Sequence, residues 1–439
     1  MKRGFYLFGS FLLVFIGIGI TINTTGVFIQ ALSRTRGFTL SSVAFIFSVG
    51  ALVNMAGAVV VGSLLNRYDH RPVMAVSILL LGGGMMLYAV CDRIWHFYLV
   101  ALLTGSGTAG SHLIPATMFV TRWFGRNRGL AMGTVLAGNG IGGLVFNPLT
   151  QYLIEINPLG TPYGYQSAYI LGGAAVIAVL LPTAMLLRLP AEGEGGYKLN
   201  PEADEAPSPG PPHGSSLSPS LESAAAPLIH SKGEADGKQQ HASLGEALRT
   251  GHYWCLAAMM LGVSAVFMGI NQHLFGHFTI SLGIPPGIAS RLVGVMMGMM
   301  VPGILLAGMV TDRVGLRASL SIFGLFLIGS LSFLPFVGAL GWAVVFVLSY
   351  GFFNVIQTVF PPLIVGIRFG ETHYPAVFGS LIVAQTLGAA FGPFIIGWVH
   401  DRNGSYIPAL IGAAAVLAVS ISLGWGVAGA GRRRVREAV

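Results

Sequence analysis

A short basic turn occurs twice in this sequence, each time between two long apolar runs. The first copy, GSLLNRYDHR, runs from Gly62 to Arg71, and the second, GMVTDRVGLR, runs from Gly308 to Arg317. The two copies lie 246 residues apart. Short basic turns of this kind join hydrophobic helices on the cytoplasmic side of a membrane, where Lys and Arg accumulate. A turn that returns at one offset therefore predicts a duplicated membrane protein.

The composition excludes an ordinary soluble domain. Of the 439 residues, 54% are hydrophobic and 9% are charged, whereas soluble domains carry about 25% charged residues. The net charge of +8 does not indicate nucleic acid as a partner, because 19 of the 24 Lys and Arg fall in segments that we place inside the cell. The other five are Arg34, Arg36, Arg93, Arg291 and Arg402. Cys91 and Cys255 lie in different halves, so no disulfide framework is expected.

Long apolar segments separated by short polar turns predict twelve transmembrane helices, because about 20 residues span a bilayer. The first six are expected at 6–32, 41–65, 73–91, 95–120, 128–152 and 167–188, and the second six at 252–281, 287–311, 317–337, 341–366, 374–399 and 406–429. The apolar run near the N-terminus has no small-residue cleavage site, which favours an uncleaved first helix over a signal peptide.

The segment 190–249 separates the two sets of six helices and is rich in Pro, Gly, Ser, Ala and Glu. It has no hydrophobic period and cannot bury enough apolar surface to become ordered, so we expect a flexible cytoplasmic linker. The expected domains are an N-terminal six-helix bundle over 1–189, this linker, and a C-terminal six-helix bundle over 250–439. Both termini then lie in the cytoplasm of a multi-pass protein of the plasma membrane, for which a bacterial inner membrane is the expected setting.

The offset of 246 residues extends beyond the repeated turns. It relates Glu155 to Asp401 and Asn139 to Gln385. A same-orientation duplication of six helices, joined by a cytoplasmic linker, resembles the major facilitator superfamily. The resemblance implies an all-α membrane protein with twelve transmembrane helices in two pseudo-symmetric bundles. One departure from the superfamily pattern is Asn66, where Asp is usual.

Two further segments resemble the monocarboxylate transporter and oxalate/formate antiporter branch of this superfamily. They are WFGRNRGLAMGTVLAGNGIGG at Trp123–Gly143 and GWVHDRNGSY at Gly397–Tyr406. The resemblance implies a secondary active transporter that moves a small organic anion by alternating access. These families carry an Arg in helix eight as a countercharge for the substrate carboxylate, but the corresponding segment here, Val301–Leu306, reads VPGILL.

No acidic or cationic residue falls near the middle of a predicted helix. Charges inside a bilayer usually mark ion or substrate pathways, so their absence leaves uncharged polar residues and histidines as candidates. The candidate substrate-binding residues are Asn23, His112, Asn139, Asn271, His273, Tyr350, Asn354, Gln357 and Gln385. Tyr350, Asn354, Gln357 and Pro361 recur at helical spacing, which predicts one polar stripe on helix ten.

Each candidate also has a purely structural interpretation. Asn or Gln in a membrane helix often only bonds a neighbouring helix. His273, together with His277, also fits an ordinary position at the outer interface of the membrane. His112 differs, because it lies ten residues from Arg122, about 15 Å deep by helical rise. A ring with an unperturbed pKa of about 6.5 at that depth is the candidate for coupling transport to protons.

The charged residues of the repeated turns are expected to act in conformational change, by holding helix ends as the halves move, and not to bind substrate. They are Arg67, Arg71, Asp312 and Arg313. No Gly-Lys-Ser/Thr phosphate loop and no zinc-ligand spacing occurs. The sequence therefore predicts no enzyme activity, no cofactor and no metal. The predicted partners are a small-molecule substrate, protons and membrane lipid, and the oligomeric state is left open. Two alternatives remain, a transporter of a neutral or larger polar solute such as a vitamin, and a non-transporting membrane receptor or scaffold.

Overall fold

A computed structural model describes residues 2–124, 128–190, 244–336, 340–369 and 374–429 of the chain. These residues form helices joined by turns, and twelve helical spans among them are long and apolar enough to cross a membrane. The predicted all-α membrane fold is therefore confirmed. Most of the predicted linker, residues 191–243, lies outside the described residues.

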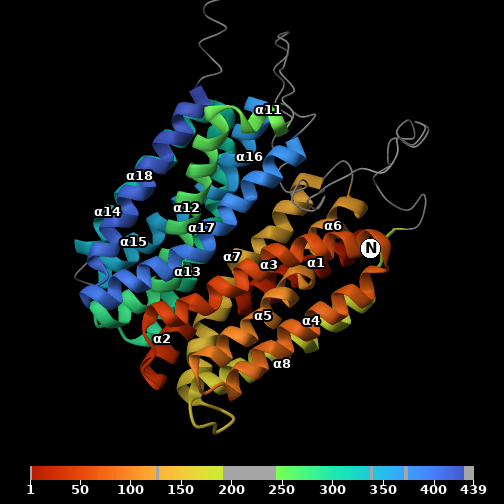
Figure 1. The fold of residues 1–439 in the computed structure, drawn as a ribbon, viewed down its shortest axis with the longest axis vertical. Helices are drawn as coiled ribbons and strands as arrows, with labels where there is room; N and C mark the ends of the chain where they lie inside the picture. Colours follow the sequence, from red (N-terminus) through yellow and green to blue (C-terminus); the bar gives the residue numbers. More distant parts are fainter. Residues whose placement is uncertain (1, 125–127, 191–243, 337–339, 370–373, 430–439) are drawn as a thin grey trace, which may run out of the picture.

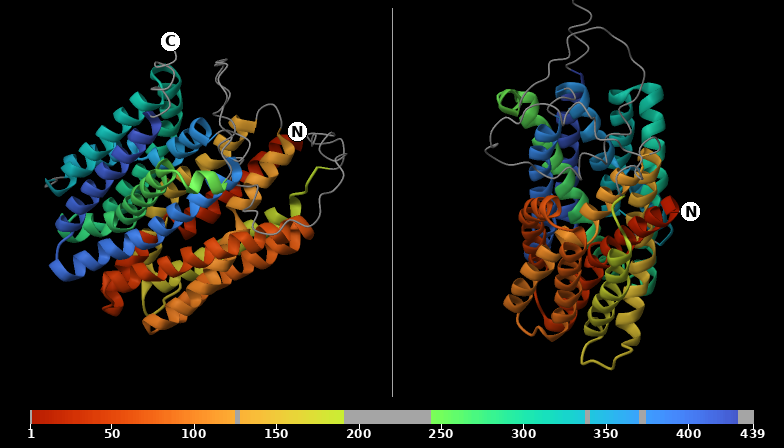
Figure 2. Two further views of the ribbon diagram at one scale, coloured as in Figure 1. Left: turned by 45° about the horizontal axis from the view of Figure 1, so that its top comes forward. Right: turned by 90° about the vertical axis from the view of Figure 1, so that its right-hand side faces the viewer.

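The helices form two bundles that lie side by side (Figures 1 and 2). The first bundle contains α1 (Lys2–Thr21), α2 (Thr25–Arg36), α3 (Leu40–Arg67), α4 (His70–Leu87), α5 (Ile94–Ser111), α6 (Leu113–Trp123), α7 (Arg128–Ile156) and α8 (Gly164–Leu186). After the short α11 (Leu244–Leu248), the second contains α12 (Gly251–Gly276), α13 (Pro286–Val314), α14 (Leu316–Phe333), α15 (Leu340–Phe353), α16 (Ile356–Phe369), α17 (Tyr374–Asn403) and α18 (Ile407–Gly429). Short 3₁₀ turns follow α4 (Tyr88–Val90) and α14 (Leu334–Phe336).

Apart from the two spans that end in a 3₁₀ turn, four predicted spans depart from a uniform α-helix, and each of these four is the first of three consecutive spans. The span expected at 6–32 is interrupted at 22–24, that at 95–120 at His112, and that at 341–366 at Asn354 and Val355. The span at 252–281 changes to a π-helical turn at His277–Ser281. The predicted stripe on helix ten is therefore divided between α15 and α16. Sequence periodicity missed these interruptions because polar residues keep their helical spacing across them.

Three helix pairs join the two bundles, namely α3 with α17, α7 with α13, and α2 with α12. Small residues permit the close approach. A Cβ added to Gly140 would lie 2.9 Å from the carbonyl oxygen of Met297, and one added to Gly294 would lie 2.9 Å from the carbonyl oxygen of Leu144. In lipid, where apolar side chains gain little over the acyl chains, helices associate through close packing, which small residues permit, and through hydrogen bonds between helices.

The two ends of the molecule differ in how the bundles meet. We call the end with the start of α1 and the end of α8 the linker end, and the end with the start of α3 and the end of α17 the far end. Figure 1 shows the bundles diverging toward the linker end. At the far end they are joined by hydrogen bonds, such as the 3.1 Å bond from Gln30 to Tyr406.

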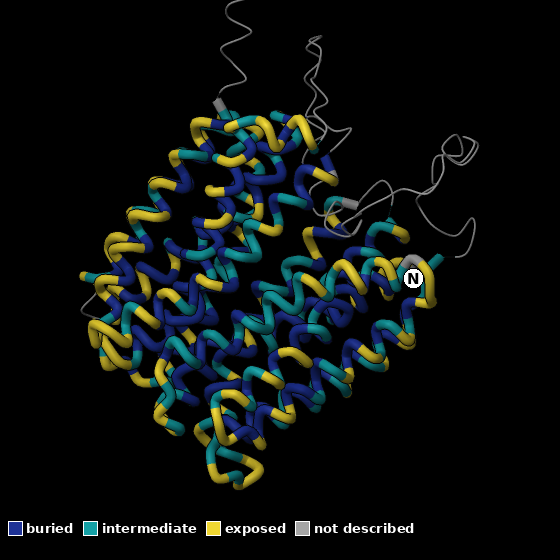
Figure 3. Tube along the Cα trace, viewed as in Figure 1, coloured by how far each residue is buried: buried dark blue, intermediate teal, exposed yellow. Residues whose placement is uncertain are grey.

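The burial pattern fits a protein surrounded by lipid. Figure 3 shows buried residues running through the inside of both bundles and exposed residues on their outer sides. Many exposed side chains are large and apolar, among them Leu325, Phe326 and Val419. In water such exposed apolar side chains would promote aggregation, whereas in a membrane they face acyl chains.

Candidate functional site

Three of the predicted site residues lie where a helix is interrupted. Asn23 lies in the turn between α1 and α2, His112 between α5 and α6, and Asn354 between α15 and α16. All three are buried. Non-helical backbone at membrane depth is tolerated only where protein or a water-filled cavity satisfies its polar groups. These breaks therefore mark the positions where the described chain departs most from a simple membrane-spanning bundle.

Asn23 and Asn139 lie in contact, although they are far apart in the sequence. The Nδ2 of Asn23 donates to the backbone oxygen of Asn139 at 2.9 Å and to its Oδ1 at 3.0 Å. Gly143 on α7 makes room for this contact, since a Cβ there would lie 3.1 Å from the Nδ2 of Asn23. Among the described residues, the Oδ1 of Asn23 and the amino group of Asn139 have no hydrogen-bond partner, and they remain available to a ligand or water.

His112 forms the break between α5 and α6, and its φ of −140° and ψ of −71° lie outside the helical region. Its Nδ1 lies 2.8 Å from the Oγ of Ser111. The side chain packs against Gly17 of α1, where an added Cβ would lie 2.5 Å from the Cβ of His112. Within the described part of the chain, Ser111 supplies the ring's one hydrogen bond. The Nε2 is therefore the atom that remains for a proton or a ligand.

The predicted stripe of helix ten brings Tyr350 next to Asn354. The backbone N–H of Asn354 donates to the carbonyl oxygen of Tyr350 at 2.9 Å. The Nδ2 of Asn354 and the Oε1 of Gln357 are buried and have no hydrogen-bond partner among the described residues. Gln385, on α17, is half-buried and likewise receives no hydrogen bond from them. A buried polar atom without a partner costs about 1–3 kcal/mol, so these atoms are expected to bind water or a ligand.

The polar residues of α12 lie toward the far end and are buried. Asn271 has two buried side-chain atoms without a partner in the described structure. The Nε2 of His273 lies 2.8 Å from the carbonyl oxygen of Pro393 on α17, and its ring centroid lies 5.7 Å from that of Tyr406. His273 is 2% exposed and His277 is 3% exposed. Neither side chain lies at an exposed interface, which was the structural alternative for both.

The charged residues of the repeated turns lie at the linker end, apart from the polar residues at the helix breaks. Arg67, Asp312 and Arg313 are exposed at the ends of α3 and α13. Arg71 is half-buried, and its Nε has no hydrogen-bond partner among the described residues. The structure thus does not bring these four residues into the candidate site.

Sequence reasoning missed two residues that join the bundles at the far end, Ser41 and Tyr406. Tyr406 accepts the bond from Gln30, and Ser41 bonds Asp401. The sequence held a signal for Tyr406, which closes the second segment that resembles the monocarboxylate branch, and for Asp401, the partner of Ser41, which repeats the position of Glu155. Ser41 itself had no such signal.

Comparison with known proteins gives a family match and several relatives that align over most of this chain. The model of the Major Facilitator Superfamily matches residues 7–393. Monocarboxylate transporter 13 of Bos taurus is 25% identical over 404 residues, which cover 90% of this chain and 82% of that protein. Monocarboxylate transporter 11 of Mus musculus is 26% identical over 373 residues, covering 83% and 73%. The aspyridones efflux protein of Emericella nidulans is 22% identical over 396 residues, covering 88% and 69%.

The fold is also that of a solved structure. A bacterial homologue of the human lysosomal transporter Spinster, solved in an inward-facing and occupied conformation, superposes with a TM-score of 0.66 at 13% identity. The superposition covers 98% of this chain and 97% of that one.

Proposed function

This chain belongs to the major facilitator superfamily, whose members are transporters and not enzymes, and we propose that it moves a small organic anion of the monocarboxylate type by alternating access. The predicted superfamily and its monocarboxylate branch are confirmed. The observation that carries the proposal is the position of Asn23, His112 and Asn354 at helix breaks. Secondary transporters build their substrate sites from interrupted helices near the middle of the membrane.

The polar groups of the proposed site suit a carboxylate bound without a permanent countercharge. Asn139 and Asn354 offer amide N–H groups that have no partner among the described residues. Asn271 offers a third such group from α12. Tyr350, Gln357, Gln385 and His273 complete the proposed set. Hydrogen bonds from several neutral donors, with one from a protonated His112, would replace the helix-eight cation of the related families.

We assign proton coupling to His112. The ring lies near the middle of its membrane span, and its Nε2 is not bonded by the described residues. An arriving carboxylate favours the protonated ring, because opposite charges attract strongly where water is excluded. One proton and one carboxylate would then cross together, which makes the proposed symport electroneutral.

We place the linker end in the cytoplasm of a plasma membrane, with a bacterial inner membrane as the proposed setting. Arg67, Arg71, Arg313 and Arg317 at the linker end support this orientation, because cytoplasmic turns collect Lys and Arg. Both termini and the linker over 190–249 then lie inside the cell, between proposed domains 1–189 and 250–439. We further propose that Arg67, Arg71, Asp312 and Arg313 control the movement of the halves and not the choice of substrate.

A neutral or larger polar solute is the second candidate. Two observations favour it, namely the lack of a cation in the segment Val301–Leu306 and the similarity to an efflux protein for aspyridones. A receptor or scaffold that transports nothing is not favoured, because the superfamily and the relatives are transporters.

Uptake by the purified protein in liposomes tests the proposal. A panel should contain small monocarboxylates, dicarboxylates and neutral solutes of matched size, each measured with the outside buffer acidic and then neutral. We expect saturable uptake of monocarboxylates that is faster from the acidic buffer. Uptake of a neutral solute, with no transport of or competition by any monocarboxylate, would replace the proposal with the second candidate.

A further inference from the structure

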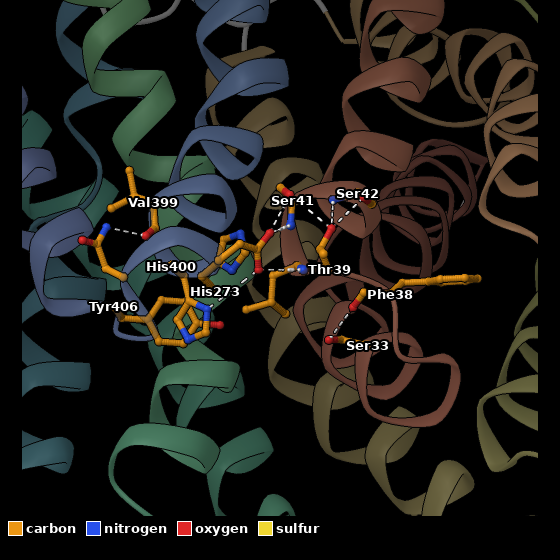
Figure 4. Close-up of polar contacts among 12 residues, drawn as sticks. Ser33, Phe38, Thr39, Ser41, Ser42, His273, Val399, His400 and Tyr406 are labelled. Atoms are coloured by element: carbon orange, nitrogen blue, oxygen red, sulfur yellow. Dashed lines mark hydrogen bonds and ion pairs between the residues drawn. The ribbon is translucent and has the colours of Figure 1, made fainter.

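The carboxylate of Asp401, near the end of α17, caps the first turn of α3 in the opposite bundle. Figure 4 shows Ser41 and its hydrogen bonds in this region. Its Oδ1 accepts the backbone N–H of Leu40 at 3.1 Å. Its Oδ2 accepts the backbone N–H of Ser41 at 2.9 Å and the hydroxyl of Ser41 at 2.5 Å. The first N–H groups of a helix have no partner inside the helix and carry the positive end of its dipole. A carboxylate is therefore strongly favoured at this position.

The backbones of α3 and α17 lie close enough for this contact because of Gly397, one turn before Asp401. A Cβ added to Gly397 would lie 2.9 Å from the backbone nitrogen of Ser41 and 3.0 Å from its Cα. Farther along the same helix pair, the Oγ of Ser48 donates to the carbonyl oxygen of Ala390 at 2.5 Å. Polar contacts thus join α3 and α17 over more than one turn.

A second contact between the bundles lies at the same end. The Nε2 of Gln30 on α2 donates to the hydroxyl of Tyr406 at 3.1 Å. Tyr406 is fully buried, and its ring centroid lies 4.2 Å from that of His400. Burial raises the pKa of the Tyr406 hydroxyl, so the group stays neutral. A side chain at Gly276 would overlap the Gln30 amide, so this position needs glycine for the contact to form.

The duplicated interface has the same carboxylate position but lacks two of the three matching donors. Glu155 on α7 precedes Asp401 by 246 residues, and Pro286 and Gly287 on α13 follow Leu40 and Ser41 by the same offset. Pro286 has no N–H to donate, and Gly287 has no hydroxyl. The carboxylate of Glu155 instead accepts a 2.8 Å bond from Gln151 on its own helix. The carboxylate cap is therefore built on the α3–α17 side.

We propose that Asp401 and Ser41 form a one-sided latch, supported by Gln30 and Tyr406, that holds the far end shut and sets how often it opens. Opening this end separates α3 from α17 and removes the carboxylate from all three of its donors. The closed far end is stabilised by these bonds, and weakening them shifts the protein toward conformations open at that end. This inference does not depend on which solute is carried.

The reaction of a buried thiol with maleimide tests the latch. The reporter is Ala44→Cys, because Ala44 is 0% exposed and lies on α3 between Ser41 and Ser48, on the same face. The native thiols are removed by Cys91→Ser and Cys255→Ala. Labelling is measured on purified protein in lipid nanodiscs without substrate, so both ends are accessible and transport is not required. We expect Asp401→Asn to raise the labelling rate at least about tenfold, since one bond to a charged group is worth about that factor.

Asp92→Asn is the matched control. Asp92 is also a carboxylate at the far end, but it pairs with Arg36 of its own bundle at 2.9 Å. Its replacement should leave the labelling rate unchanged. Ser41→Ala should raise the labelling rate less than Asp401→Asn does. In the double variant, the combined effect on the free energy of opening should be smaller than the sum of the two single effects.

Equal labelling in Asp401→Asn and the parent, or an equal increase in Asp92→Asn, would overturn the latch. If Asp401→Asn does not fold, Gly397→Ala and Ser41→Ala replace it in the experiment. Gly397→Ala weakens the same contact by pushing the two backbones apart, and Ser41→Ala removes its hydroxyl donor. A failure here leaves the proposed substrate untouched. Conversely, a wrong substrate class leaves the labelling rates unchanged.

Discussion

His112 occupies the space that a side chain on Gly17 would need. A Cβ added to Gly17 would lie 2.5 Å from the Cβ and 2.6 Å from the Cγ of His112, closer than such atoms approach in proteins. The first helix thus positions the ring at the break between α5 and α6. The position of this candidate coupling group therefore depends on Gly17, whose lack of a side chain leaves room for the ring.

Gly17→Ala is expected to slow uptake by about tenfold, because the added methyl group displaces the ring and overpacking of this kind costs about 1–3 kcal/mol. Initial uptake rates in liposomes measure the effect, and size-exclusion chromatography checks that the variant is folded. Gly4→Ala is the matched control on the same helix, since a Cβ at Gly4 meets no atom within 4 Å. Equal uptake in the two variants would show that Gly17 does not position His112.

His112→Gln should abolish the acceleration of uptake by acidic outside pH, because an amide cannot take up the transported proton. Uptake rates between about pH 6 and about pH 8 measure this dependence. The control is His96→Gln, which changes a histidine at the start of α5, the helix that ends just before His112, and should retain the wild-type profile. A wild-type pH profile in His112→Gln would remove His112 as the coupling group. Coupling through His273 or His277, or uniport or exchange, would then describe the protein better.

Asn23→Ala should raise the KM for the transported anion by about fivefold, since a neutral hydrogen bond contributes about 1 kcal/mol. In the double variant with Asn139→Ala, the loss of binding free energy obtained from KM should be smaller than the sum of the losses in the two single variants. The reason is that the two amides bond each other. Asn403→Ala removes an exposed amide that bonds only its own helix and should leave KM unchanged. Additive effects of Asn23→Ala and Asn139→Ala would contradict a shared site.

Replacement of Arg67 by Gln or of Asp312 by Asn should lower the maximal rate of transport while the relative KM values of two competing substrates stay the same. Both side chains lie at exposed helix ends and not among the polar residues of the breaks. Competition between two labelled substrates in the same liposomes measures the preference directly. A switch in preference in either variant would show that the turns act on substrate choice.

The number of spans and their duplication were readable from local sequence. The thickness of a bilayer sets how many apolar residues a span needs, so hydropathy alone located twelve spans. The repeated basic turn revealed the duplication, because two copies of one short pattern at a single offset need no knowledge of contacts. Candidate residues such as Asn23 and His112 also stood out locally, since polar groups at membrane depth are rare and costly.

The helix breaks and the contacts between distant residues were decided by tertiary packing. Tyr350, Asn354 and Gln357 keep helical spacing, yet the backbone departs from the helix between them. Asn23 reaches Asn139, and Asp401 reaches Ser41, at places where Gly143 and Gly397 allow the helices to approach closely. In lipid, the free energy of an apolar helix face changes little when one apolar neighbour replaces another. Hydropathy therefore places the helices in the membrane, whereas close packing of small residues and a few polar bonds select which helices meet.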